Sequence, residues 1–231
     1  MKFKGILSTT FFVAAQFIIS NLYAQVNWGL NVGLNYSNIN AISELRNEIE
    51  SHAIPRMNVG LSVDIPIYGD LYVQPTLMYS GKGYRSDAGE IGFTKDFKAR
   101  VTYLELPVQI LFKPEVSSGS MVIGFGPYIA YGLGGKWKSP EDVLIGDILI
   151  SNQGDIEFNK NGDEADYGTY VYGRPWDYGG KAVLGYEFLR KYLLQFNYQW
   201  GMADIMSSWG DDERNGSIKT KGFGLSVGYK F

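Results

Sequence analysis

The sequence predicts an all-β protein: an eight-stranded antiparallel up-and-down transmembrane β-barrel. Apolar residues alternate with polar residues or glycine in eight segments, which is the period-two pattern of a strand with two different faces. The connections between these segments are alternately short and long, and aromatic residues recur near the segment ends. Both features are typical of membrane barrels with short periplasmic turns and long extracellular loops.

The first four predicted strands carry the alternation most regularly. A strand projects successive side chains to opposite faces, so each segment has one apolar face and one face of polar residues or glycine. In the fourth strand, for example, Leu104 and Leu106 share a face opposite Glu105. The four strands are predicted at residues 26–36, 56–67, 71–84 and 101–113.

The last four predicted strands are rich in glycine on the face opposite the apolar one. The final strand, "IKTKGFGLSVGYKF", sets Leu225 and its apolar neighbours against glycine, serine and lysine and ends on Phe231. A terminal aromatic residue resembles the C-terminal signature by which the barrel assembly machinery recognises outer-membrane proteins. These strands are predicted at residues 121–135, 178–188, 192–203 and 218–231.

The connections support the up-and-down order. Short ones fall at residues 68–70, 114–120 and 189–191, and long ones at residues 37–55, 85–100, 136–177 and 204–217. With an even number of strands, both termini of the barrel domain lie on the short-turn side.

Two kinds of eight-stranded barrel fit this pattern. A soluble, lipocalin-like barrel would turn its apolar residues inward around a ligand, whereas a membrane barrel turns them outward to lipid. The polar face combines glycine with amide and charged side chains, which suits a narrow lumen better than a solvated exterior. We therefore predict that the apolar face contacts lipid.

The N-terminus predicts export. A basic start at Lys2 and Lys4, an apolar run and a small residue at Ala24 form the pattern of a secretory signal, so residues 1–24 are predicted as a signal peptide and 25–231 as the barrel domain. The chain has no cysteine, which excludes a disulfide framework and a lipid-anchored lipoprotein. Its net charge of −3 argues against a nucleic-acid partner. The expected location is the bacterial outer membrane.

Short motifs carry a family resemblance over the whole predicted barrel domain. They are "WGLNVG" at residues 28–33, "YLELP" at 103–107, "GFGPY" at 124–128 and the "GYKF" end. With these motifs the chain resembles the PorT-like outer-membrane β-barrel family. The resemblance implies the barrel type and, through the family's namesake, a link to protein secretion across the outer membrane. No residue here matches one tied to that activity.

Two sets of residues are candidate sites. Charged residues on the inward face are expected to form a polar network in the lumen, because a charge buried there without a partner is costly; they are Asp64, Lys82, Glu105, Lys181 and Glu187. Aromatic residues of the third long loop are candidates for a recognition surface, since such rings give rigid contact area, although they could equally extend the barrel wall; they are Tyr167, Tyr170, Tyr172, Trp176 and Tyr178.

Catalysis, a metal site and a cofactor are not expected. His52 is the single histidine and lies beside Ser51 in a loop, where neither is held as a catalytic pair. Acidic residues in the long loops are suited to calcium, but their spacing does not match an EF-hand, so a solvated loop is the preferred interpretation.

The leading functional hypothesis is a small outer-membrane barrel with a filled polar lumen. Its role would be structural or in surface recognition, with a link to secretion. Its expected partners are outer-membrane lipid and lipopolysaccharide, the barrel assembly machinery, and a protein or glycan at the extracellular loops. The alternatives are narrow-pore transport of small solutes and an enzyme that modifies outer-membrane lipid.

Overall fold

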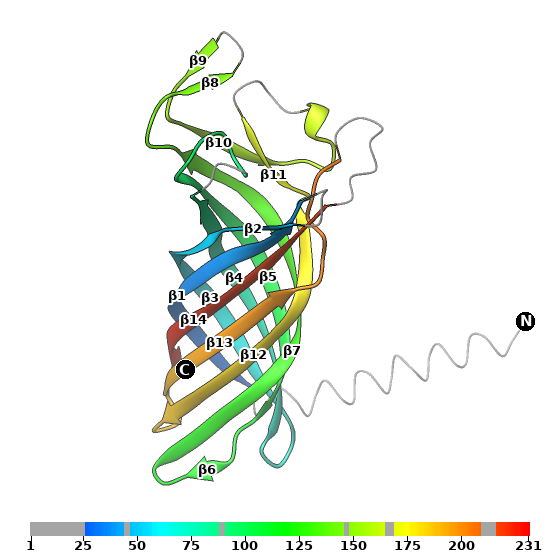
Figure 1. Cartoon of the computed structure of the whole chain (residues 1–231). Helices are drawn as coiled ribbons and strands as arrows, with labels where there is room; N and C mark the ends of the chain where they lie inside the picture. Colours follow the sequence, from blue (N-terminus) through cyan, green and yellow to red (C-terminus); the bar gives the residue numbers. More distant parts are fainter. Residues whose placement is uncertain (1–25, 44–46, 88–90, 146–147, 165–168, 209–215) are drawn as a thin grey trace, which may run out of the picture.

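Eight long strands form the body of the protein (Figure 1). The structure is a computed structural model, and it describes residues 26–43, 47–87, 91–145, 148–164, 169–208 and 216–231. The predicted signal peptide, 1–24, lies outside the described residues. The barrel strands are β1 (Asn27–Ile42), β3 (His52–Tyr68), β4 (Leu71–Ser86), β5 (Phe97–Phe112), β7 (Gly119–Lys138), β12 (Trp176–Phe188), β13 (Tyr192–Gly201) and β14 (Ser217–Lys230).

The eight strands close into a barrel with no free edge. Each pairs antiparallel with the next along the chain, and β14 returns to pair with β1. At the closing seam Leu34 lies opposite Leu225 of β14 and Met57 of β3. The closed eight-stranded antiparallel barrel predicted from the sequence is therefore confirmed.

The two faces of the wall differ as the alternation predicts. Leu225 on β14 is 55% exposed, and Phe196 beside it is also exposed on the outer face. Glu105 and Lys181 are buried in the interior. Exposed rings gather near both ends of the strands: Trp28, Phe112, Phe188, Tyr192 and Tyr229 toward the short turns, and Tyr36, Tyr79, Tyr131, Trp176, Tyr178 and Tyr198 toward the long loops.

At the long-loop end the strands extend further than predicted. β1 continues to Ile42 and β3 begins at His52, so most of the predicted loop at 37–55 is paired strand. β5 begins at Phe97 and β7 runs to Lys138, and the two strands still pair at this end, with Lys98 opposite Lys138. Backbone N–H and C=O groups need partners beyond the apolar wall as well, and continued pairing provides them.

Short elements complete both ends. Among the described residues, no helix is long and apolar enough to span a membrane. A short strand lies in one of the short turns, and the others lie at the long-loop end, where β8 and β9 form a separate hairpin that projects from the top of the barrel in Figure 1. They are β2 (Glu48–Ile49), β6 (Glu115–Val116), β8 (Val143–Ile145), β9 (Ile148–Ile150), β10 (Gln153–Phe158), the 3₁₀ helix η1 (Gly162–Glu164) and β11 (Tyr170–Gly173).

Substitution of Leu225 by arginine tests the lipid contact of the outer face. We expect Leu225→Arg to lower the free energy of unfolding by about 2–4 kcal/mol, because it places a charge in hydrocarbon. Val116→Arg is the matched control, since Val116 is exposed in a short turn, and it should change stability by less than about 1 kcal/mol. Equilibrium urea unfolding in phosphatidylcholine vesicles measures both, and equal effects would contradict the assigned faces.

Candidate functional site: the closed barrel interior

The interior is filled in layers along the barrel axis. On the inward face of β5, the order from the short turns upward is Leu111, Gln109, Pro107, Glu105, Tyr103 and then apolar residues to Phe97, while Lys113 follows the strand directly. All are buried. The interior therefore holds charged groups at two levels, with apolar and neutral polar side chains between and above them.

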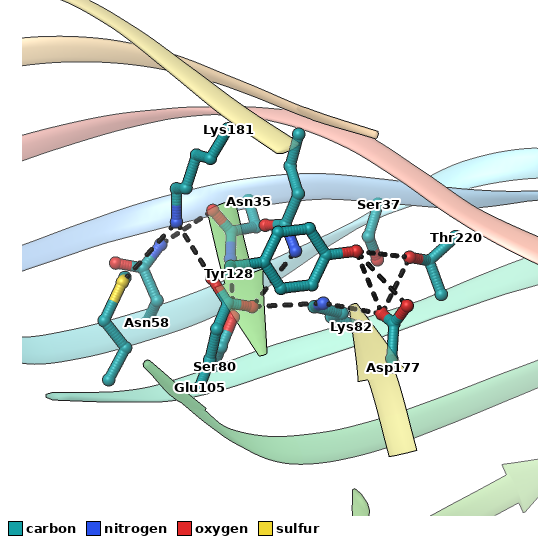
Figure 2. Close-up of polar contacts among 12 residues, drawn as sticks. Asn35, Ser37, Asn58, Ser80, Lys82, Glu105, Tyr128, Asp177, Lys181 and Thr220 are labelled. Carbon is teal, nitrogen blue, oxygen red and sulfur yellow. Dashed lines mark hydrogen bonds and ion pairs between the residues drawn. The ribbon is translucent and has the colours of Figure 1, made fainter. Parts of the chain in front are cut away.

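The middle layer is a buried ion-pair network, here named the upper cluster: Lys82, Glu105, Asp177 and Lys181. Glu105 binds both ammonium groups, with Lys181 Nζ 3.0 Å from Oε1 and Lys82 Nζ 3.1 Å from Oε2. Lys82 Nζ also lies 3.3 Å from Asp177 Oδ2. Figure 2 shows these side chains pointing toward one another inside the barrel. Two cations face two anions, so the layer is neutral, as burial of charge requires.

Neutral groups also donate hydrogen bonds to the two carboxylates of the upper cluster. Thr220 donates a hydrogen bond of 2.8 Å to Asp177 Oδ2, and the Tyr128 hydroxyl donates at 3.2 Å to the same carboxylate (Figure 2). Gln199 Nε2 donates to Glu105 Oε2 at 3.1 Å. Buried polar groups are stable when they are fully hydrogen-bonded, and these contacts meet that condition for both carboxylates.

A second ion-pair network closes the interior near the short turns, here named the lower cluster: Asp64, Lys113, Glu187 and Lys230. Lys230 contacts both carboxylates, and Lys113 contacts Asp64 and lies 3.5 Å from Glu187 Oε2. Lys113 Nζ also sits 4.9 Å from the centre of the Tyr72 ring. This layer is neutral as well, and it joins β3, β5, β12 and β14.

The predicted lumen network is therefore two networks rather than one. All five predicted residues are buried and paired, but Glu187 does not join Glu105 and Lys181. Lys181 and Glu187 are six positions apart on one strand, which separates them by about 20 Å. The prediction omitted Lys113, Asp177 and Lys230. Lys113 and Lys230 alternate with the apolar residues of their strands, so the sequence pattern already indicates that they face inward. Asp177 falls in the predicted long connection at residues 136–177, where the pattern gives no direction.

The long-loop end of the interior is apolar, which corrects the prediction of a polar lumen throughout. β10 and β11 fold over this end and pack against the inward residues of β5 and β7. Rings and aliphatic side chains form the apolar cap: Ile39, Tyr84, Phe97, Val101, Tyr103, Trp137, Ile156, Phe158, Tyr170 and Tyr172. Within it the hydroxyls of Tyr84 and Tyr170 lie 2.6 Å apart, and burial raises the pKa of Tyr170 to about 12.

The predicted aromatic recognition surface does not form as one surface. Tyr172 is buried in the apolar cap, and Tyr170 packs against it and is partly buried. Trp176 and Tyr178 are exposed on the outer wall of β12, in the ring belt toward the long loops. Tyr167 lies outside the described residues. Burial removes Tyr172 from the predicted surface because β11 folds inward onto the barrel.

Little open space remains between the layers. The cavity beside Lys82 has a volume of about 10 Å³, which is room for a single water molecule. A polar cavity of about 380 Å³ opens at the short-turn end, with the lower cluster among the residues that line it. Solvent can thus reach the lower cluster from one side, while the layers above it are closed.

The other chemical candidates are accounted for by local contacts. His52 Nε2 lies 2.8 Å from Asp87 Oδ2, and Ser51 donates to the carbonyl of Ile39, so the two side chains have different partners. Within the described part of the chain, no group of three or more histidine, cysteine, aspartate or glutamate residues is placed to hold a metal ion. The acidic residues at 211–213 lie outside that part.

Residues 14–207 match the family described as "Outer membrane protein beta-barrel domain". The chain belongs to this family. The apolar outer wall is thus the lipid-facing wall of an outer-membrane barrel, with the short turns periplasmic and the long loops extracellular. No curated protein matches the chain.

Solved outer-membrane barrels are similar to the chain at low identity. They include Ail, the attachment invasion locus protein of Yersinia pestis (11% identity, 90% of this chain and 99% of that chain, TM-score 0.40). OprG from Pseudomonas aeruginosa is 13% identical over 89% of this chain and 95% of its own, with a TM-score of 0.44. AlkL, solved in lipid bilayers, is 10% identical over 90% of each chain, with a TM-score of 0.46. Similarities at this level transfer no function.

Removal of Glu105 tests the upper cluster. Glu105→Ala should lower the free energy of unfolding by about 3–5 kcal/mol, because it leaves two buried ammonium groups with one carboxylate between them. Glu115→Ala is the matched control: it removes the exposed pair with Arg190 and should cost less than about 1 kcal/mol. Thermal and urea unfolding of the folded barrel measure both variants. Unchanged melting of Glu105→Ala would contradict the packing role of this cluster.

Proposed function

We propose that the protein is an occluded integral barrel of the bacterial outer membrane, with a structural or surface-recognition role and no open pore. The observation that carries this proposal is that side chains fill the barrel interior at successive levels along its axis. Two neutral ion-pair clusters and the apolar cap fill the interior, and the cavity at the middle layer is about 10 Å³. A solute path through the lumen would have to break buried ion pairs, which is costly.

The extracellular end is the part of the molecule best placed to meet a partner. The β8–β9 hairpin stands clear of the barrel in Figure 1 and pairs with no barrel strand, and Leu149 on it is 67% exposed. An end filled by the apolar cap, with Leu149 exposed on a projecting hairpin, supports recognition of a protein or glycan outside the cell. This surface takes the place of the loop tyrosines that the sequence suggested.

A role in protein secretion is the finer form of this proposal. It rests on the resemblance of residues 28–33, 103–107 and 124–128 to the PorT-like family. In this form the barrel would serve as a membrane anchor that a secretion component binds. Its terminal strand, ending on Phe231, would be the segment read by the barrel assembly machinery.

Conductance measurements separate an occluded barrel from a pore. We expect the folded full-length protein in a planar lipid bilayer to show no steady conductance above the bare membrane, because the buried layers leave no continuous water path. Glu105→Ala in the same bilayer is the comparison, since loss of the bridging carboxylate loosens the middle layer and should give transient openings. Steady, large conductance of the wild-type barrel would overturn the proposal that the barrel is occluded and would favour narrow-pore transport.

A further inference from the structure

A group of basic side chains lies on the outer wall above the ring belt at the extracellular end. Four adjacent strands, β3, β4, β5 and β7, contribute to it. The residues, here named the basic wall patch, are Arg56, Arg85, Lys98, Arg100, Lys136 and Lys138. They stand out in a chain whose net charge is −3, and neither the interior layers nor the proposed function uses them.

The strand register places like charges directly opposite one another. Lys98 pairs with Lys138 and Arg100 with Lys136 across β5 and β7, and Arg85 of β4 pairs with Lys98. Like charges at directly opposed positions destabilise a sheet. The wall therefore carries a local repulsion that an anion held against it would relieve.

Arg56 joins this face through an irregularity in β3. The β3–β4 register shifts between Ala53 and Asn58, and the Arg56 side chain lies over Gly81, whose missing side chain leaves the room. Burial, together with the nearby Arg100 guanidinium, lowers the pKa of Arg56. Gly81 lies two residues after the outward-facing Tyr79 on β4, so it is on the outer face of the strand. The Arg56 side chain, which lies over Gly81, is therefore on the outer face too, and it adds β3 to the strands that form the patch.

Carboxylates neutralise only part of the patch. Asp87 pairs with Arg85, with Asp96 also nearby, and Asp155 pairs with Lys136 at 2.9 Å in an exposed position. Among the residues that the structure describes, no acidic group forms an ion pair with the remaining four members, Arg56, Lys98, Arg100 and Lys138. These four cations have no acidic partner among the described residues, and Arg100 and Lys138 are exposed.

The position of the patch indicates where that anion comes from. On β5 the lipid-facing Leu104 lies four residues below Arg100, which is about 13 Å along the strand. On the neighbouring strands Tyr79 and Tyr131 pair with Leu104 and complete the exposed ring belt. The patch thus lies just outside the hydrocarbon layer, at the level of the lipid headgroups of the outer leaflet.

We propose that the basic wall patch binds the phosphate groups of an outer-leaflet glycolipid, with the lipid A part of lipopolysaccharide as the ligand. Arginine binds phosphate oxygens through two parallel hydrogen bonds, and lysine adds charge beside it. The acyl chains of the same molecule would lie against the apolar wall below. A lipid meets both requirements at once, whereas a soluble anion would use the cations alone.

Binding of diphosphoryl lipid A to the full-length folded barrel tests this site. The variant Lys98→Gln/Arg100→Gln/Lys138→Gln removes three cations that have no acidic partner. In mixed detergent micelles, native mass spectrometry should show at least tenfold weaker retention of diphosphoryl lipid A by this variant than by wild type. The charge-conserving variant Lys98→Arg/Arg100→Lys/Lys138→Arg should retain the lipid. Heat-modifiable gel mobility establishes that each barrel is folded.

Matched controls distinguish the site from general attraction. Lys160→Gln/Lys191→Gln/Lys219→Gln removes three exposed cations elsewhere on the barrel and should bind as wild type does. Lipid A without its phosphates should bind wild type as weakly as diphosphoryl lipid A binds the patch variant, and millimolar inorganic phosphate should not displace the lipid. Equal retention by the patch variant, equal binding of dephosphorylated lipid, or displacement by inorganic phosphate would each overturn the proposal.

Discussion

Strands β1 and β14 close the sheet into a barrel, and the arrangement of the interior follows from this closure. Within lipid every backbone N–H and C=O group needs a partner inside the protein, so the first and last strands must pair and leave no edge. Eight strands closed in this way enclose a lumen only wide enough to be filled by side chains. The interior is therefore a packing problem, and the identity of its side chains decides whether anything can pass.

The protein fills this interior with charge, but only in balanced sets. The upper and lower clusters each contain two ammonium and two carboxylate groups, contributed by strands far apart in the sequence. A buried pair adds little net stability over an apolar core, whereas removal of one partner is costly. Such clusters hold the strands in register and make any passage through the lumen expensive.

The two ends of the barrel have different characters. The periplasmic end opens on a polar cavity of about 380 Å³, while the apolar cap fills the extracellular end where β10 and β11 pack onto β5 and β7, beside a cleft of about 480 Å³ lined by β1, β2 and Lys221. The projecting hairpin β8–β9 and the basic wall patch lie on the outside of this end. Both proposals concern these surfaces, because the closed lumen offers a ligand no continuous route.

Alternation with period two is a local property of a strand, so the sequence was enough to predict the number of barrel strands, their up-and-down order and the direction of side chains along the regular parts of the strands. It placed Leu225 outward and Glu105 inward correctly. It did not determine that Glu187 pairs with Lys113 and Lys230, or that Tyr170 and Tyr172 fold into the cap. Those contacts depend on strand register and on how β11 packs across the barrel, which bring together residues far apart in the chain, and no local pattern encodes them.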